Sequence, residues 1–154
     1  MIYTDKTNKA MKFMYEKHKN QFDKSGLPYI HHPLHVAEEM DDEISTIVAL
    51  LHDVIEDTDA TWEDLEKLDI PKEAIEAIHL MTHDNSISYQ DYIERISTNP
   101  LARKVKMADL RHNMDPTRIP NMTETDMLRL EKYQRSYEFL KNVEYQNRYE
   151  RKEM

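Results

Sequence analysis

The chain has 154 residues, a formal net charge of −9, a single glycine and no cysteine. The negative charge argues against a nucleic-acid partner, which needs a stripe of lysine and arginine. Without cysteine, disulfides, thiolate metal ligands and thiol nucleophiles are excluded. The scarcity of glycine disfavours the tight turns of β-hairpins and so favours an all-α fold.

The length of the chain fits one domain with its own hydrophobic core. We expect a single unit over residues 1–154, with its core at about 5–115 and a long C-terminal helix at about 123–150. The polar N-terminus is unlike a signal peptide, and no apolar run approaches the roughly 20 residues of a membrane-spanning helix. We therefore expect a cytoplasmic protein without a membrane partner.

Capping residues, prolines and apolar spacing divide the chain into predicted helices. In chain order these are expected at about 5–20, 33–40, 43–56, 61–68, 71–83, 88–97, 99–114 and 123–150. The loop between the first two contains Gly26 and Pro28. The inner stripe of the last helix is expected to comprise Met127, Leu130, Tyr133 or Gln134, Tyr137 and Leu140.

Four ionisable residues follow the apolar run 47–51, namely His52, Asp53, Glu56 and Asp57. In one continuous helix, positions four apart share a face, so His52 would stack with Glu56 and Asp53 with Asp57. Ionisable groups beside a buried segment are costly unless something compensates them. A divalent metal ion would do so, because it is often the largest local charge in a site.

Two further segments offer candidate ligands. His31 and His32 stand at the junction between the first loop and the second helix, and Asp109 follows Val105, Met107 and Ala108 on an amphipathic helix. Taken alone, an aspartate in such a setting is more often a surface residue or a local cap.

Taken together, His32, His52-Asp53 and Asp109 form the order His…His-Asp…Asp, which resembles the HD-domain metal-dependent phosphohydrolases. The flanking sequences make the resemblance specific. The segments 24–33 (KSGLPYIHHP), 49–58 (ALLHDVIEDT) and 105–114 (VKMADLRHNM) resemble the guanosine tetraphosphate hydrolase domain of the stringent-response enzymes. The resemblance covers about residues 11–114 and implies a compact HD-domain helical bundle.

The resemblance implies that His32, His52, Asp53 and Asp109 hold one divalent metal ion. Manganese is the ion associated with this family, and iron, magnesium and zinc are also compatible with two imidazoles and two carboxylates.

The resemblance also assigns roles around the metal. Glu56 and Asp57 match the acidic pair that the family places beside the attacking water, although as residues alone they could simply cap or solvate the end of a helix. Lys24, Ser25 and Asn113 match positions near the substrate. His83 is a further candidate for the substrate pocket.

The sequence departs from the family at two charged positions. Asp23 and Asp115 stand where the stringent-response enzymes carry basic residues, which should weaken the binding of a highly charged nucleotide. Arg111 and Arg118 are candidates to compensate in part. No counterpart of the synthetase domain is present in the sequence, so we expect no pyrophosphate-transferring activity.

The leading hypothesis is a metal-dependent phosphohydrolase of a nucleotide phosphate or pyrophosphate, with guanosine 3′,5′-bis(diphosphate) 3′-pyrophosphohydrolase as the favoured activity. One alternative is an HD nucleotidase or phosphodiesterase of another substrate. That enzyme could hold a second metal through His79 and His83, which lie four apart on one predicted helix face. The other alternative is a catalytically silent nucleotide-binding protein.

Overall fold

The computed structural model describes residues 1–153, and over this range the expected all-α fold is confirmed. The helices are α1 (Asp5–His18), α2 (His31–Glu38), α3 (Glu43–Leu51), α4 (Val54–Asp57), α5 (Trp62–Glu66), α6 (Lys72–Met81), α7 (Tyr89–Ser97), α8 (Pro100–Asn113), the 3-10 helix η1 (Pro116–Arg118) and α9 (Glu124–Glu153). No helix among these residues is both long enough and apolar enough to cross a bilayer.

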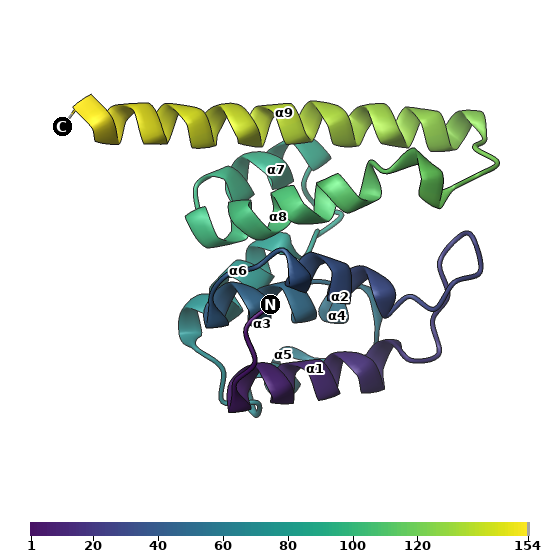
Figure 1. Cartoon of the computed structure of the whole chain (residues 1–154), viewed down its shortest axis with the longest axis vertical. Helices are drawn as coiled ribbons and strands as arrows, with labels where there is room; N and C mark the ends of the chain where they lie inside the picture. The colour runs from purple at the N-terminus through teal and green to yellow at the C-terminus, as the bar shows by residue number, and fades with distance from the viewer. Residues whose placement is uncertain (154) are drawn as a thin grey trace.

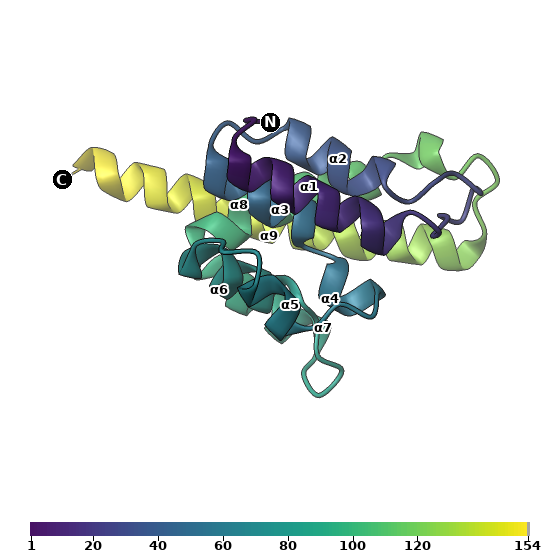
Figure 2. The same cartoon turned by 90° about the horizontal axis from the view of Figure 1, so that it is seen from below.

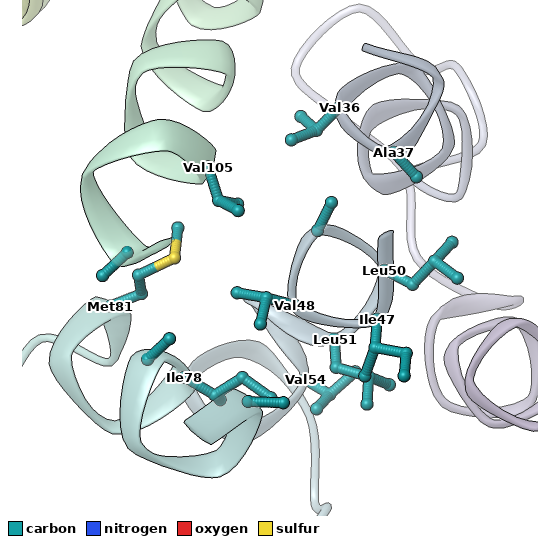
Figure 3. Packing of buried hydrophobic residues seen from close by; sticks show 14 of the residues in the cluster. Val36, Ala37, Ile47, Val48, Leu50, Leu51, Val54, Ile78, Met81 and Val105 are labelled. Atoms are coloured by element: carbon teal, nitrogen blue, oxygen red, sulfur yellow. The ribbon is translucent and has the colours of Figure 1, made fainter. Parts of the chain in front are cut away.

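Helix α3 is the centre of the hydrophobic core. It packs against α1, α2, α6 and α8, and each of its residues from Ser45 to Leu51 is buried. Figure 3 shows Val48 directed toward Ile78 and Met81 of α6, while Val36 and Ala37 of α2 lie on another side of α3. A helix that is apolar on every side is stable only when neighbours surround it, and these helices do so.

Helix α9 forms an outer layer on the bundle. It packs against α8 and α7 and runs along that side of the molecule, with its C-terminal end projecting past the other helices (Figures 1 and 2). Leu140 is its fully buried apolar residue. The predicted inner position of Met127 was wrong, because its side chain is 52% exposed and Asp126 is buried instead.

Several predicted helix starts are confirmed at the level of side-chain hydrogen bonds. Thr61 and Asp64 form a reciprocal capping box at α5. The Ser88 side chain accepts from the Asp91 N–H at the start of α7, and the Asn99 side chain accepts from the Ala102 N–H before Pro100 begins α8. These caps satisfy N–H groups that have no partner inside their own helix.

The prediction of one continuous helix over 43–56 was wrong. α3 ends at Leu51, His52 and Asp53 form a turn, and α4 begins at Val54. Asp53 has φ −105° and ψ −3°, a sparsely allowed conformation that active-site residues often adopt. His52 Nδ1 donates to the Ala49 carbonyl oxygen at 2.6 Å, which replaces hydrogen bonding that the interrupted helix gives up.

Two other helix boundaries change the interpretation of histidines. α2 begins at His31 and not at Pro33, so His32 lies in its first turn. α6 ends at Met81 and Thr82 is extended, so His79 and His83 do not share a helix face. His79 stacks on Trp62 with 3.4 Å between the ring centroids, whereas His83 turns back toward α4. The chelating pair of the alternative di-metal hypothesis is therefore not formed.

We predict that Leu50→Ala lowers the free energy of unfolding by about 2–5 kcal/mol, because Leu50 is fully buried and its truncation leaves a cavity in the core. Denaturant unfolding followed by circular dichroism measures the change. The matched control is Leu128→Ala on α9, where the side chain is 62% exposed and the expected change is within about 0.5 kcal/mol. Equal losses in the two variants would contradict the central role of α3.

Candidate active site

Four side chains from separate parts of the fold converge at one buried point. His32 comes from α2, His52 and Asp53 from the turn after α3, and Asp109 from α8. Each offers one potential ligand atom, and these atoms all lie within 4.8 Å of one another. The structure thus brings together all four residues that the sequence nominated as metal ligands.

The donor atoms face one another closely. His32 Nε2 lies 2.8 Å from Asp109 Oδ1, and His52 Nε2 lies 3.0 Å from Asp53 Oδ2 and 3.3 Å from Asp109 Oδ1. Three of the four residues are buried and Asp53 is partly exposed. Two carboxylates and two imidazoles in so small a buried volume form a donor set of the kind that binds divalent metal ions.

The imidazole of His52 is oriented in the way that is usual for a histidine that binds a metal ion. A carbonyl oxygen can only accept, so the contact with Ala49 fixes the proton on Nδ1 and directs Nε2 into the group. Among residues 1–153, this Nε2 is buried and makes no well-aligned hydrogen bond, although two carboxylate oxygens lie 3.0 and 3.3 Å away. A metal-ligating histidine almost always donates its other nitrogen to a fixed acceptor. This nitrogen of His52 therefore fits a metal ion.

The other ring nitrogen of His32, Nδ1, also has a hydrogen-bond partner. This Nδ1 lies 2.7 Å from Nδ1 of His112, and the two rings meet edge to edge, with an interplanar angle of 5° and their centroids 5.0 Å apart. Burial, followed by the nearby charge of Arg118, lowers the pKa of His112 to about 3. His112 is therefore neutral at pH 7. A proton on His32 Nδ1 satisfies the contact, so Nε2, which lies 2.8 Å from Asp109 Oδ1, is the ring nitrogen that faces the cluster.

Asp109 is stabilised as a carboxylate by Lys106. The Lys106 ammonium donates to Asp109 Oδ2 at 2.8 Å, and the Asn113 side chain donates to Oδ1 at 3.1 Å. Burial alone would raise the pKa of Asp109, but Lys106 and then His32 hold it well below its usual range. With Oδ2 engaged by Lys106, Oδ1 is the atom that faces the two histidines.

Asp53 is stabilised by a different set of groups. The Tyr29 hydroxyl donates to its Oδ2. Burial opposes ionisation of Asp53, but His52 outweighs it and lowers the pKa of Asp53 to about 2. The same carboxylates act back on His52. Burial by itself lowers the pKa of His52, yet Asp53 and Asp109 hold it well above its usual value.

Glu56 and Asp57 lie beside this cluster, on the cleft side. One oxygen from each comes within 4.8 Å of an Asp53 oxygen. Glu56 Oε1 accepts from the backbone N–H of His83 at 2.6 Å, which fixes its orientation. Partial burial, followed by the charges of Asp53 and Glu56, raises the pKa of Asp57 to about 7. Asp57 can therefore exchange a proton near neutral pH.

Two residues of the cluster, Asp53 and Asp109, line a cleft with a volume of about 590 Å³. The four residues nominated for the substrate all line it, together with the acidic pair: Lys24, Ser25, His83, Asn113, Glu56 and Asp57. Asn113 also accepts from Arg118 at 3.1 Å, and His83 Nε2 donates to the Ile87 carbonyl oxygen at 3.1 Å. Lys24 pairs with Asp126 across the cleft.

The two acids that depart from the family pattern have local partners. Asp23 Oδ1 accepts from the backbone N–H groups of Ser25 and Leu27, each at 2.9 Å, while Oδ2 lies 3.0 Å from His31 Nε2. Asp115 caps η1 and accepts from the Thr117 N–H at 3.0 Å. These contacts reduce the repulsion that the two carboxylates would exert on an anionic ligand.

Of the two candidate compensating arginines, Arg118 lines the cleft and lies 3.9 Å from Asp23. Arg111 pairs with Glu39 at 3.4 Å, and it is not among the residues that line the cleft.

Sequence reasoning missed several residues that shape the site. Tyr29, His112 and Lys106 contact metal-ligand candidates directly, and Arg129 and Lys132 of α9 line the cleft. The spacing of Lys106 and Asp109, three apart on a helix, was a usable signal. α9 lies outside the resembling segment, so its two cations had no sequence signal.

We predict that binding of a divalent metal at pH 7 releases protons. His52 is protonated without a cation because its pKa is raised, and Asp57 is about half protonated at its pKa of about 7. A cation lowers both pKa values, so on the order of one to two protons leave and the apparent affinity rises with pH. Calorimetric titration in buffers of different ionisation enthalpy counts these protons. Asp57→Asn should release fewer, and a buffer-independent enthalpy would contradict the prediction.

Comparison with known proteins adds an independent line of argument. No family model matches the chain. The chain is 36% identical over 116 residues to the bifunctional (p)ppGpp synthase/hydrolase SpoT of Escherichia coli, an alignment that covers 64% of this chain and 16% of that protein. It is 42% identical over 69 residues to the guanosine-3′,5′-bis(diphosphate) 3′-pyrophosphohydrolase of Aquifex aeolicus, covering 42% of this chain and 10% of that protein.

A third relative and a solved structure extend these matches. The GTP pyrophosphokinase rsh of Brucella melitensis is 34% identical over 121 residues, covering 70% of this chain and 16% of that protein. The chain thus spans about a sixth or less of the length of these relatives. A solved structure of a metazoan ortholog of SpoT that hydrolyses ppGpp matches with a TM-score of 0.73 and 26% identity, over 89% of this chain and 85% of that one. By sequence and by fold, the chain resembles the guanosine tetraphosphate hydrolase domain of SpoT- and Rsh-type proteins among the HD-domain phosphohydrolases.

Proposed function

We propose that this protein is a metal-dependent phosphohydrolase whose substrate is guanosine 3′,5′-bis(diphosphate), from which it removes the 3′-pyrophosphate. The observation that carries the proposal is the buried His52 Nε2, grouped with His32, Asp53 and Asp109 beside a cleft that Asp53 and Asp109 line. The relatives named above as SpoT and as a 3′-pyrophosphohydrolase act on this nucleotide, and this supports the choice of substrate.

The proposed cofactor is one manganese ion held by His32, His52, Asp53 and Asp109. A divalent cation in that position would supply a Lewis acid, which makes water a nucleophile at neutral pH and offsets charge on phosphoryl oxygens. The protein prepares the ligands for this role by holding Asp53 and Asp109 ionised and by fixing the His52 proton on Nδ1.

Glu56 and Asp57 divide the handling of the attacking water between them. The N–H of His83 fixes the Glu56 carboxylate, so Glu56 is suited to orient the water. Asp57 has a pKa of about 7 in the metal-free protein and loses its proton when a cation binds. Its carboxylate makes no such backbone contact with His83, so Asp57 is suited to take the proton of the water as a general base.

Cationic side chains on the cleft walls can balance the remaining negative charge of the substrate. Lys24 comes from the first loop, Arg118 from η1, Lys106 from α8, and Arg129 and Lys132 from α9. Burial, followed by repulsion from Arg129 and Lys106, lowers the pKa of Lys132. Cations that repel one another favour an anionic ligand, because its charge relieves the repulsion.

The direct test is release of pyrophosphate from guanosine 3′,5′-bis(diphosphate) by the purified protein with manganese. Asp53→Ala should lose both metal and activity. Asp57→Asn should retain the metal and lose about 10²- to 10⁴-fold in kcat, the usual contribution of a positioned base. Metal content is measured by elemental analysis and activity by phosphorus NMR or chromatography. Hydrolysis of simpler nucleotides without release of pyrophosphate would refute the assigned substrate, and full activity in Asp53→Ala would refute the metal site.

We also predict that Arg129→Gln raises KM for this substrate about tenfold, because a hydrogen bond to a charged group contributes about 1.5–3 kcal/mol. Arg135→Gln is the matched control, since Arg135 is exposed on the same helix and does not line the cleft. Steady-state kinetics of the two variants in the same buffer make the comparison. An equal change in both would show that the effect is one of general charge and not of the cleft.

A further inference from the structure

An exposed aromatic side chain stands on the wall of the cleft. Phe22 lines the cleft with 66% of its surface accessible, among the most exposed large apolar side chains of the described residues. Leu27 belongs to the same loop and is 53% exposed, but it does not line the cleft. Because burial of a phenyl ring is favourable, Phe22 offers the cleft an apolar surface that an apolar part of a ligand can cover.

The loop that carries Phe22 is well ordered by its own hydrogen bonds. Phe22 and Pro28 form an isolated antiparallel bridge. The Asp23 N–H donates to the Leu27 carbonyl oxygen at 2.8 Å, and the Tyr29 N–H donates to that of Gln21 at 2.9 Å. Gly26 makes the turn with φ +82°, a conformation that glycine adopts without strain. The ring is therefore presented by a fixed backbone.

The same loop is fixed to the opposite side of the cleft. Ser25 Oγ donates to the Arg118 carbonyl oxygen at 2.5 Å, and Asp23 lies 3.9 Å from the Arg118 guanidinium. Phe22 and Ile119, the chain neighbours of Asp23 and Arg118, both line the cleft. Met122 and Leu130 also line the cleft, so apolar side chains surround this region.

The position of Phe22 relative to the proposed reaction centre suits a nucleoside. The Gln21 side chain donates to the Asp57 carbonyl oxygen at 2.6 Å, which places Phe22 one residue away from a contact with the catalytic turn. The cleft therefore has a charged end, at Asp53 and Asp109, and an apolar wall nearby. A nucleotide has the same division, with its phosphates at one end and an aromatic base at the other.

We infer that Phe22 is the platform on which the nucleobase of the substrate stacks. The inference rests on the proposed function and deepens it by assigning the base-binding residue. Every nucleobase has an aromatic face, and stacking on a protein aromatic contributes about 1–3 kcal/mol per base. Phe22 thus supplies affinity for the nucleoside, while the charged end of the cleft acts on the phosphates.

The test compares Phe22→Ala, Phe22→Trp and Leu27→Ala in the full-length chain with manganese. Phe22→Ala should raise KM for guanosine 3′,5′-bis(diphosphate) about five- to hundredfold, the equivalent of the lost stacking, with kcat within about threefold of the parent. Phe22→Trp should restore KM, and Leu27→Ala should leave it unchanged. Inhibition by inorganic pyrophosphate, which has no base, should be equal in all four proteins.

Three results would overturn the inference: an unchanged KM in Phe22→Ala, the same loss in Leu27→Ala, or a parallel loss of pyrophosphate inhibition. Equilibrium binding of GDP and of ADP to the same proteins separates this inference from the proposed function. If the parent hydrolyses no nucleotide, the proposed function fails. Weaker binding of both nucleotides to Phe22→Ala alone would still support the stacking role, and equal binding to all variants would refute it.

Discussion

The structure depends on the confinement of Asp53 and Asp109 with two imidazoles in one buried volume. Such groups are expensive to remove from water unless each is paired or hydrogen-bonded. Each has a dedicated partner, local for two of them (Lys106 for Asp109 and Ala49 for His52) and distant in sequence for the other two (Tyr29 for Asp53 and His112 for His32). These partners come from the first loop, α3 and α8. The hydrogen bonds of the four side chains therefore fix the relative placement of much of the bundle.

The apolar helix α3 makes that confinement possible. Because α3 is buried on all sides, its last turn is held rigidly, and Ala49 presents its carbonyl oxygen at a fixed place. The chain leaves helical geometry immediately afterwards, at His52 and Asp53. Regular helical hydrogen bonds are lost at this turn, but the turn directs the side chains of His52 and Asp53 into the same cluster. The short α4 then returns Glu56 and Asp57 to the cleft side.

Local signals in the sequence predicted the helix starts well, since a cap such as Thr61 with Asp64 involves residues only three apart. They predicted the four candidate ligands through the order of motifs. They did not predict the turn at His52. The residues around it favour a helix, and the turn depends on a hydrogen bond between the His52 imidazole and the Ala49 carbonyl oxygen. They also missed the roles of His112, whose partner is 80 residues away, and Asp126, whose pairing with Lys24 spans 102 residues and displaces Met127 from the inner face. Such contacts exist only once the helices have packed.

The pairing of Lys24 with Asp126 has a consequence for how the cleft exchanges ions. Asp126 is almost wholly buried and Lys24 is half exposed, so the free protein carries its own counter-ion at the mouth of the cleft. An anionic ligand that takes Lys24 must displace this internal carboxylate and not a salt ion from solution. Affinity arising from the release of solution ions varies with ionic strength, whereas an exchange between two bound anions does not. Ligand binding should therefore depend less steeply on salt than the number of cations in the cleft suggests.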